Sequence, residues 1–145
     1  KPVFVCENPA VVLAAANTLG AACPPLVCVS GQPTAAVLRL LSQLSESECP
    51  LYYHGDFDWG GIRIANLLWG RFPMQAWRFD TQSYVAGVSR RSASLRGRPV
   101  TAVWDPDLRA TIERHGVRVE EEAVLTDLLA DLALGVAPEP SGRDS

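Results

Sequence analysis

The stretch 52–61, with the sequence YYHGDFDWGG, holds the residues best suited to chemistry. An apolar run enters it from Leu51 and a helix-like apolar pattern leaves it, which predicts a strand, a tight glycine turn and a helix. Side chains two residues apart at a strand end point the same way, so Asp56 and Asp58 would present two carboxylates to one spot. Adjacent carboxylates repel unless a cation lies between them, and oxygen ligands suit Mg²⁺ or Mn²⁺. The stretch therefore predicts a divalent-metal site; the alternative is a solvated Asp-rich turn with no metal.

The surrounding elements would bring a third carboxylate to this site. Apolar runs alternate with helix-like patterns, which predicts a Rossmann-like, three-layer α/β domain with a mainly parallel sheet of about four strands and helices on both faces. Active groups in such sheets gather beyond the carboxyl ends of the strands. Glu7 ends the first expected strand, so it would join Asp56 and Asp58 if the first and third strands are neighbours. The expected strands are 2–6, 26–29, 51–54 and 75–79, and the expected helices are 9–19, 33–44, 62–69, 83–88, 105–115 and 120–134.

Two further acidic positions could belong to the site. The sequence Asp105-Pro106-Asp107 repeats the Asp-x-Asp spacing, but Asp105 as a helix cap followed by proline in the first turn explains it better. Glu121 falls on the apolar stripe of the last expected helix, where it is either a rim residue or a fourth metal ligand.

Charge is divided unevenly along the chain. The 145 residues have 48% hydrophobic and 20% charged side chains and a formal net charge of −3, which suits one globular domain. Residues 63–98 carry seven arginines against one acid. This basic segment predicts contact with a phosphate backbone, and an ordinary arginine-rich surface is the alternative. Arg63, Arg90 and Arg91 are the candidate DNA contacts.

The cysteines and the lack of long apolar runs indicate the cellular environment we expect for the chain. The four cysteines form no CxxC pair and have no histidine at zinc spacing, which favours reduced thiols in a cytoplasmic protein. No apolar run is long enough to span a bilayer and no signal peptide opens the chain, so we expect no membrane association. We interpret the chain as a piece of a longer protein in which residues 1–136 form one domain and 137–145 form a disordered tail.

These residues resemble the Toprim domain, which topoisomerases, bacterial primases and several nucleases share. The signature of that domain is a glutamate after the first strand and an Asp-x-Asp after the third, matched here by Glu7, Asp56 and Asp58. Many Toprim domains have proline after the second aspartate, where this chain has Trp59. The resemblance covers the chain to about Leu134 and implies Mg²⁺, with Mn²⁺ as a possible substitute, bound by the three acids, with Glu7 sharing the metal or acting as general acid/base.

A closer resemblance is to the C-terminal domain of the nuclease subunit of Wadjet-type plasmid defence systems. It rests on five short motifs, which are CENP at 6–9, SGQP at 30–33, DFDWGG at 56–61, WDP at 104–106 and EEA at 121–123. The resemblance implies a metal-dependent endonuclease that cleaves DNA together with an SMC-like ATPase complex, and that dimerises through regions outside this chain.

Three alternatives remain open. A Toprim domain without activity could dock partners or bind DNA, and a type IIB topoisomerase-like domain would break strands with a tyrosine from elsewhere. Phosphatases of the haloacid-dehalogenase type also use Asp-x-Asp after a strand, but they need a lysine near the phosphate and Lys1 is the only lysine here.

Overall fold

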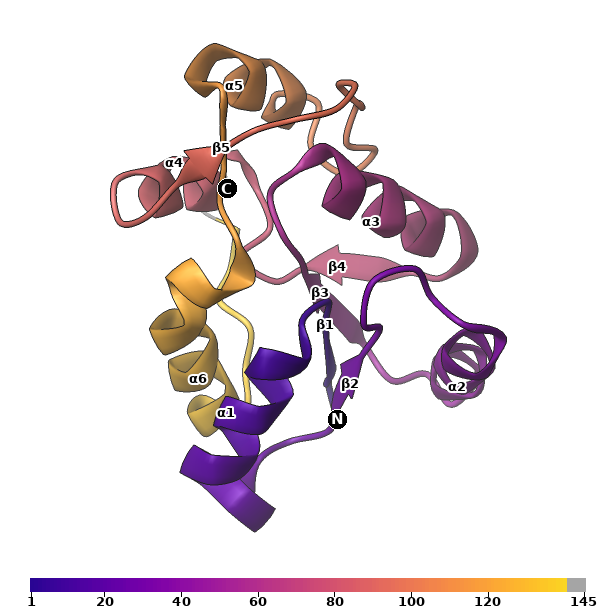
Figure 1. The fold of residues 1–145 in the computed structure, drawn as a ribbon. Helices are drawn as coiled ribbons and strands as arrows, with labels where there is room; N and C mark the ends of the chain where they lie inside the picture. Colours follow the sequence, from indigo (N-terminus) through magenta and orange to yellow (C-terminus); the bar gives the residue numbers. More distant parts are fainter. Residues whose placement is uncertain (141–145) are drawn as a thin grey trace.

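The computed structural model describes residues 1–140, and a four-stranded parallel sheet forms its centre (Figure 1). The strand order is β2-β1-β3-β4, and every pair of neighbours is parallel. The first and third strands are therefore neighbours, as the site prediction requires. The expected Rossmann-like three-layer α/β fold is confirmed. The strands are β1 (Val3–Cys6), β2 (Leu26–Cys28), β3 (Leu51–His54) and β4 (Met74–Ala76).

Helices cover both faces of the sheet, with α1 and α6 on one face and α2 and α3 on the other (Figure 1). Alternation along β1 explains the two cores, because Phe4 and Cys6 face one helical layer while Val3 and Val5 face the other. The helices are α1 (Pro9–Leu19), α2 (Ala35–Glu46), α3 (Trp59–Arg71), α4 (Thr81–Val88), α5 (Leu108–His115) and α6 (Leu125–Leu134), with 3₁₀ turns η1 (Gly20–Ala22) and η2 (Glu121–Val124).

A second, two-stranded sheet lies beside the main one and was not predicted. The strands β5 (Ala93–Ser94) and β6 (Val117–Arg118) pair antiparallel. Directly after β6, Val119 forms an antiparallel bridge with Phe57, with their backbone N–H and C=O groups bonded in both directions at 2.8 and 3.2 Å. The segment after β6 thus runs against the turn that follows β3.

Several element boundaries differ from the expected ones. Helix α3 begins at Trp59, because Asp58 is extended and caps it. Strand β4 ends earlier than expected, and two residues beyond it Arg78 has a φ of 48° in the left-handed region. The last expected helix, 120–134, divides into η2 and α6, so Glu121 does not lie on the stripe of an α-helix.

The ends of the described region add two observations. Residues 137–140 form no helix or strand, and the remainder of the expected tail, 141–145, lies outside the described residues. Among the helices of residues 1–140, none has the length and hydropathy needed to cross a membrane.

Candidate carboxylate site

Two acids come together where β1 and β3 end. Cys6 and His54 are partners in the parallel register, and Glu7 and Asp56 follow them by one and two residues. The Asp56 backbone N–H donates to Oε1 of Glu7 at 3.1 Å. The structure therefore places these two predicted site residues side by side.

Two glycines make this approach possible. A Cβ atom at Gly55 would lie 2.9 Å from Oε1 of Glu7 and 3.0 Å from the Tyr53 hydroxyl oxygen. At Gly61 a Cβ atom would lie only 2.2 Å from the backbone oxygen of Asp56. Any larger residue at either position would push the acid-bearing turn away from its neighbours.

Asp58 lies near Glu7 and Asp56, but its side chain also caps a helix. Its Oδ1 accepts from the Gly61 N–H at 2.6 Å, which caps the N-terminus of α3. Its charge still acts on the site, since it raises the pKa of both Glu7 and Asp56. Across residues 1–140, however, no three His, Cys, Asp or Glu side chains are close enough to hold a metal ion as they stand. The expected convergence of all three carboxylates around one cation is thus not pre-formed.

Glu121 holds the site together from the other end of the chain. Its Oε1 accepts from the backbone N–H groups of Glu7, at 3.0 Å, and of Asn8. Its Oε2 lies 3.0 Å from Nδ1 of His54, and its own N–H donates to Oδ1 of Asp56 at 2.8 Å. Both carboxylate oxygens are occupied, which argues against the role of metal ligand considered for Glu121. Its geometry is that of a positioning residue.

His54 is a neutral partner in this arrangement. Burial lowers the pKa of its ring to about 3, so the hydrogen bond between Nδ1 and Oε2 of Glu121 involves an uncharged ring. In the sequence His54 is distinguished only by lying two and four residues before Asp56 and Asp58. Its role depends on a contact with Glu121 that periodicity cannot reveal. Within the described region, His54 Nε2 and the Tyr53 hydroxyl are buried without a hydrogen-bond partner.

The carboxyl groups of the site bind protons more tightly than usual. Burial, together with the charges of Asp56, Glu121 and Asp58, raises the pKa of Glu7 to about 8, against one opposing backbone hydrogen bond. Burial, followed by the charges of Glu121 and Asp58, raises the pKa of Asp56 to about 6 despite a backbone hydrogen bond. Burial also raises the pKa of Glu121 to about 8. Partly desolvated acids that repel one another favour a cation between them.

The donor set fits a hard divalent cation. The hydrogen bonds formed among residues 1–140 use one oxygen each of Glu7, Asp56 and Asp58 and leave the other oxygen of each acid for a ligand. Carboxylate oxygens are the ligands that Mg²⁺ and Mn²⁺ prefer. These three acids are therefore the residues that could hold such an ion once their side chains move together.

The second Asp-x-Asp sequence has a structural role. Oδ2 of Asp105 accepts from the backbone N–H and hydroxyl of Thr81 at 2.7 and 2.8 Å, and Oδ1 accepts from the Asp107 N–H at 3.1 Å. The expected helix cap is shifted, because Asp107 precedes α5 and makes no side-chain capping bond. Asp105 instead ties the start of α4 to the segment before α5.

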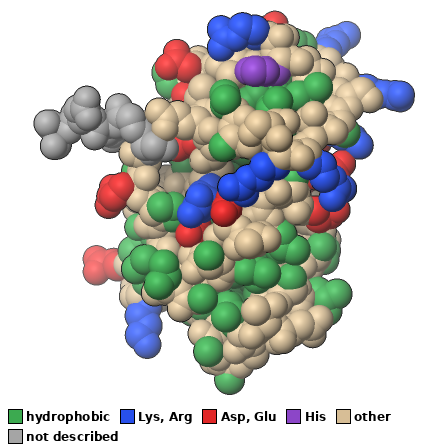
Figure 2. Space-filling view, turned by 90° about the vertical axis from the view of Figure 1, so that its left-hand side faces the viewer, with side chains coloured by type: hydrophobic (Ala, Val, Ile, Leu, Met, Phe, Trp, Pro, Cys, Tyr) green, Lys and Arg blue, Asp and Glu red, His purple; other side chains and the backbone are tan. Residues whose placement is uncertain are grey.

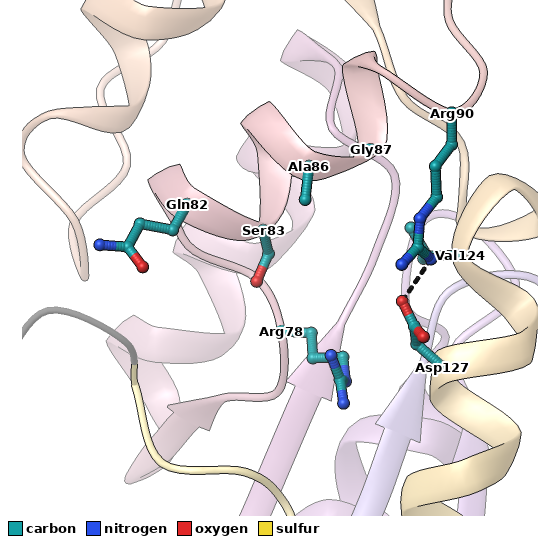
Figure 3. Close-up of a pocket in the computed structure, with 8 residues that line it drawn as sticks. All are labelled: Arg78, Gln82, Ser83, Ala86, Gly87, Arg90, Val124 and Asp127. Carbon is teal, nitrogen blue, oxygen red and sulfur yellow. Dashed lines mark hydrogen bonds and ion pairs between the residues drawn. The ribbon is translucent and has the colours of Figure 1, made fainter.

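The candidate DNA-binding arginines are separated. Arg63 donates to the backbone oxygen of Arg98 at 2.9 Å. Arg90 forms an ion pair with Asp127 across a pocket of about 260 Å³ between α4 and α6 (Figure 3). Arg91 is exposed and lines a second hollow with Arg118 and Glu120. Glu120 directly precedes Glu121, the positioning residue of the site.

The face that carries α4, α6 and α1 shows how these charges are distributed. Basic side chains cross the middle of this face, acidic side chains lie beside them, and hydrophobic side chains gather below (Figure 2). The arginines thus form a band mixed with acids instead of a continuous basic surface.

These features define a Rossmann-like α/β protein with a carboxylate site at the carboxyl ends of neighbouring parallel strands. Residues 1–132 match the family described as "Protein of unknown function C-terminus (DUF2399)", and the chain belongs to this family. Comparison with curated proteins gave no match.

Proposed function

We propose that this chain is a metal-dependent nuclease domain of the Toprim type that hydrolyses phosphodiester bonds in DNA. The observation that carries the proposal is the pairing of Glu7 and Asp56. They follow adjacent parallel strands, each uses one oxygen in a backbone hydrogen bond, and both have a raised pKa beside Asp58.

Glu7, Asp56 and Asp58 would hold Mg²⁺, with Mn²⁺ as a substitute. When bound, the ion polarises a phosphodiester and lowers the pKa of a water molecule. Without it, Glu7 has a pKa of about 8, so the chain itself supplies a carboxyl group that can hold a proton near neutral pH. Glu121 fixes the backbone N–H groups at positions 7 and 8 and so orients the Glu7 side chain.

The tyrosines favour hydrolysis over strand transfer. Tyr53 and Tyr84 are fully buried, and the Tyr84 hydroxyl donates to the backbone oxygen of Val117 at 2.6 Å. Tyr52 is half-buried on β3, where its ring stacks against Phe4. A covalent tyrosyl–DNA intermediate would therefore need a tyrosine from another chain or domain, whereas water suffices for hydrolysis.

The resemblance of the five short motifs to Wadjet nuclease subunits supports a more specific proposal. The chain would be the DNA-cleaving domain of the nuclease subunit of a Wadjet-type plasmid defence system, acting with an SMC-like ATPase complex as a homodimer formed through other regions. Arg63, Arg90 and Arg91 would contact DNA phosphates, and Arg91 lines a hollow together with Arg118 and Glu120.

A second candidate is a catalytically silent Toprim module that docks partners or binds DNA. The lack of a ready-made three-ligand group among residues 1–140 favours it. Titration with Mg²⁺ in a calorimeter separates the two functions, since a docking module need not bind the ion at millimolar concentration.

Cleavage of plasmid DNA tests the proposal. The protein is incubated with supercoiled and linear plasmid and with Mg²⁺, Mn²⁺ or EDTA. We expect metal-dependent cleavage that Glu7→Gln and Asp56→Asn abolish and that Asp105→Asn preserves. Equal cleavage by Asp56→Asn and Asp105→Asn would refute the proposed site.

DNA binding can be tested separately from cleavage. Replacing Arg90 and Arg91 with alanine should weaken binding and flatten its salt dependence. Each lost phosphate contact lowers the slope of log affinity against log salt by about 0.9. An unchanged slope would assign these arginines to another partner.

A further inference from the structure

Two cysteines lie opposite each other beside the carboxylate site. Cys6 on β1 and Cys28 on β2 are partners in the parallel register, so their side chains leave the same face of the sheet. The Cys28 thiol donates to the backbone oxygen of Glu7 at 3.4 Å, and the Cys6 thiol contacts that of Asn8 at 3.7 Å. Both sulfur atoms therefore point at the turn that carries Glu7.

The spacing of these strands suits a disulfide. Neighbouring strands lie about 4.8 Å apart, within the range of about 4.4–6.8 Å between Cα atoms that disulfides span. All four thiols are free in this structure, so the pair is present in its reduced form.

The two thiols differ in access to solvent. Cys6 is fully buried, whereas Cys28 is half-buried on the edge strand of the sheet. A small oxidant can reach Cys28, and Cys6 is the thiol that Cys28 can reach. Cys23 follows the η1 turn, and Cys49 lies in the loop before β3 with its thiol directed to the Ser47 backbone oxygen. They provide matched controls within the same chain.

We propose that Cys6 and Cys28 are an oxidisable thiol pair that closes to an intrachain disulfide when a hydroperoxide is present. The sulfur of Cys28 attacks the O–O bond, giving a sulfenic acid at Cys28 and releasing an alcohol, or water from hydrogen peroxide. The sulfur of Cys6 then attacks the Cys28 sulfur and expels water. Two thiols thereby lose two electrons and two protons, and the hydroperoxide is reduced.

The bond would act on the turn next to it. It removes the S–H donors that now contact the Glu7 and Asn8 carbonyl groups and ties the end of β1 to β2. Because Glu7 follows Cys6 directly, the disulfide would alter how Glu7 is held. Only the effect on catalysis rests on the proposed function; disulfide formation does not.

Peptide mapping of the oxidised chain provides the test. The 145-residue protein is treated with a few equivalents of hydrogen peroxide, free thiols are alkylated, and the unreduced chain is cut with a protease specific for glutamate. Cleavage after Glu7 separates Cys6 from Cys28, so a disulfide links fragment 1–7 to fragment 8–46. We expect this linked species, the loss of two thiols per chain and complete reversal by dithiothreitol.

Variants keep the result interpretable. Cys6→Ser and Cys28→Ser should each abolish the linkage, whereas Cys23→Ser and Cys49→Ser should retain it. If Cys6→Ser does not fold, Cys6→Ala replaces it at the same buried position. Preferential oxidation of Cys23 or Cys49, or sulfinic acid at Cys28 with Cys6 still reduced, would overturn the proposal. A reversible Cys6–Cys28 disulfide in a protein that never cleaves DNA would support the thiol pair and count against the nuclease function.

Discussion

The two Asp-x-Asp turns, at 56–58 and 105–107, share their spacing but have opposite surroundings. The Asp105 carboxylate is surrounded by donors, since Thr81 supplies two hydrogen bonds and the Asp107 N–H a third. The Asp56 carboxylate has one backbone donor and is partly buried beside other acids, and burial followed by these charges raises its pKa to about 6. The comparison teaches that the balance of donors and acids around an aspartate separates a structural carboxylate from a candidate ligand.

The largest effect is expected from replacing Glu121, because its backbone N–H donates to Asp56 and its side chain holds the turn that carries Glu7. Glu121→Ala leaves the backbone N–H groups of Glu7 and Asn8 without their acceptor and the His54 ring without its hydrogen-bond partner. We expect a loss of about 3–5 kcal/mol in the free energy of unfolding, measured by urea denaturation.

Glu122 provides the control for that measurement. Its side chain is exposed and, among residues 1–140, accepts a hydrogen bond from the Asn8 amide alone. Glu122→Ala should therefore change the free energy of unfolding by less than about 0.5 kcal/mol. Similar losses for the two alanine variants would show that Glu121 does not hold the site together.

Asp56→Asn tests the acid-rich turn directly. It keeps the acceptor for the Glu121 N–H and removes one of the repelling charges. We expect cleavage to fall by at least about 100-fold, since loss of even an outer partner of a metal ligand reduces activity by about 10–100-fold. The melting temperature in EDTA should stay the same or rise, and the stabilisation by added Mg²⁺ should largely disappear.

The donor-rich turn should respond in the opposite way. Asp105→Ala removes the acceptor for Thr81 and should lower the free energy of unfolding by about 1–3 kcal/mol, with cleavage per folded molecule unchanged. A cleavage defect in the Asp105 variant at full folding would remove the distinction between the turns.

Asp58 lies between the two cases, because it caps α3 and also adds its charge to the site. Asn caps helices as well as Asp does, so Asp58→Asn should melt in EDTA like the unmodified protein, whereas Asp58→Ala should lose about 1 kcal/mol. Both should lose cleavage. If Asp58→Asn melts clearly earlier in EDTA and keeps the full Mg²⁺ response, Asp58 is only a turn residue.

The smallest expected effect is a pH dependence of stability. Glu7 and Glu121 have folded-state pKa values of about 8, above their ordinary value of 4.5, so the folded state binds more protons than the unfolded state between these limits. The stability of the metal-free protein should therefore fall as pH rises from about 6.5 to 8. His54, with its lowered pKa, acts in the other direction only below its ordinary value of 6.5. Melting temperatures in EDTA should show this decline, and Glu7→Gln should flatten it.

Much of the architecture could be predicted from local patterns. Short segments of four or five residues between helical patterns indicated the four strands, and parallel pairing followed from their alternation with helices. The placement of Glu7 and Asp56 followed from the rule for strand ends. These inferences succeed because they depend on periods of a few residues.

The arrangement around Glu121 could not be predicted in the same way. It depends on the bridge between Phe57 and Val119, which joins distant parts of the chain, and on strands of two residues that are too short to show a period. The sequence singled out Glu121 through the apolar stripe of the last expected helix and the EEA motif, and neither signal reveals its pairing with His54 or with the turn after β1.

The reach of Glu121 back to the start of the chain has a consequence for biosynthesis. A ribosome makes the domain from its N-terminus, so Glu7, Asp56 and Asp58 emerge well before the residue that clamps the first turn. A growing chain, or one cut short before Glu121, carries every proposed ligand but lacks the hydrogen bonds that hold Glu7 in place. If the domain is a nuclease, translation order itself delays activity until the domain is nearly finished, which would protect the DNA of the cell that makes it.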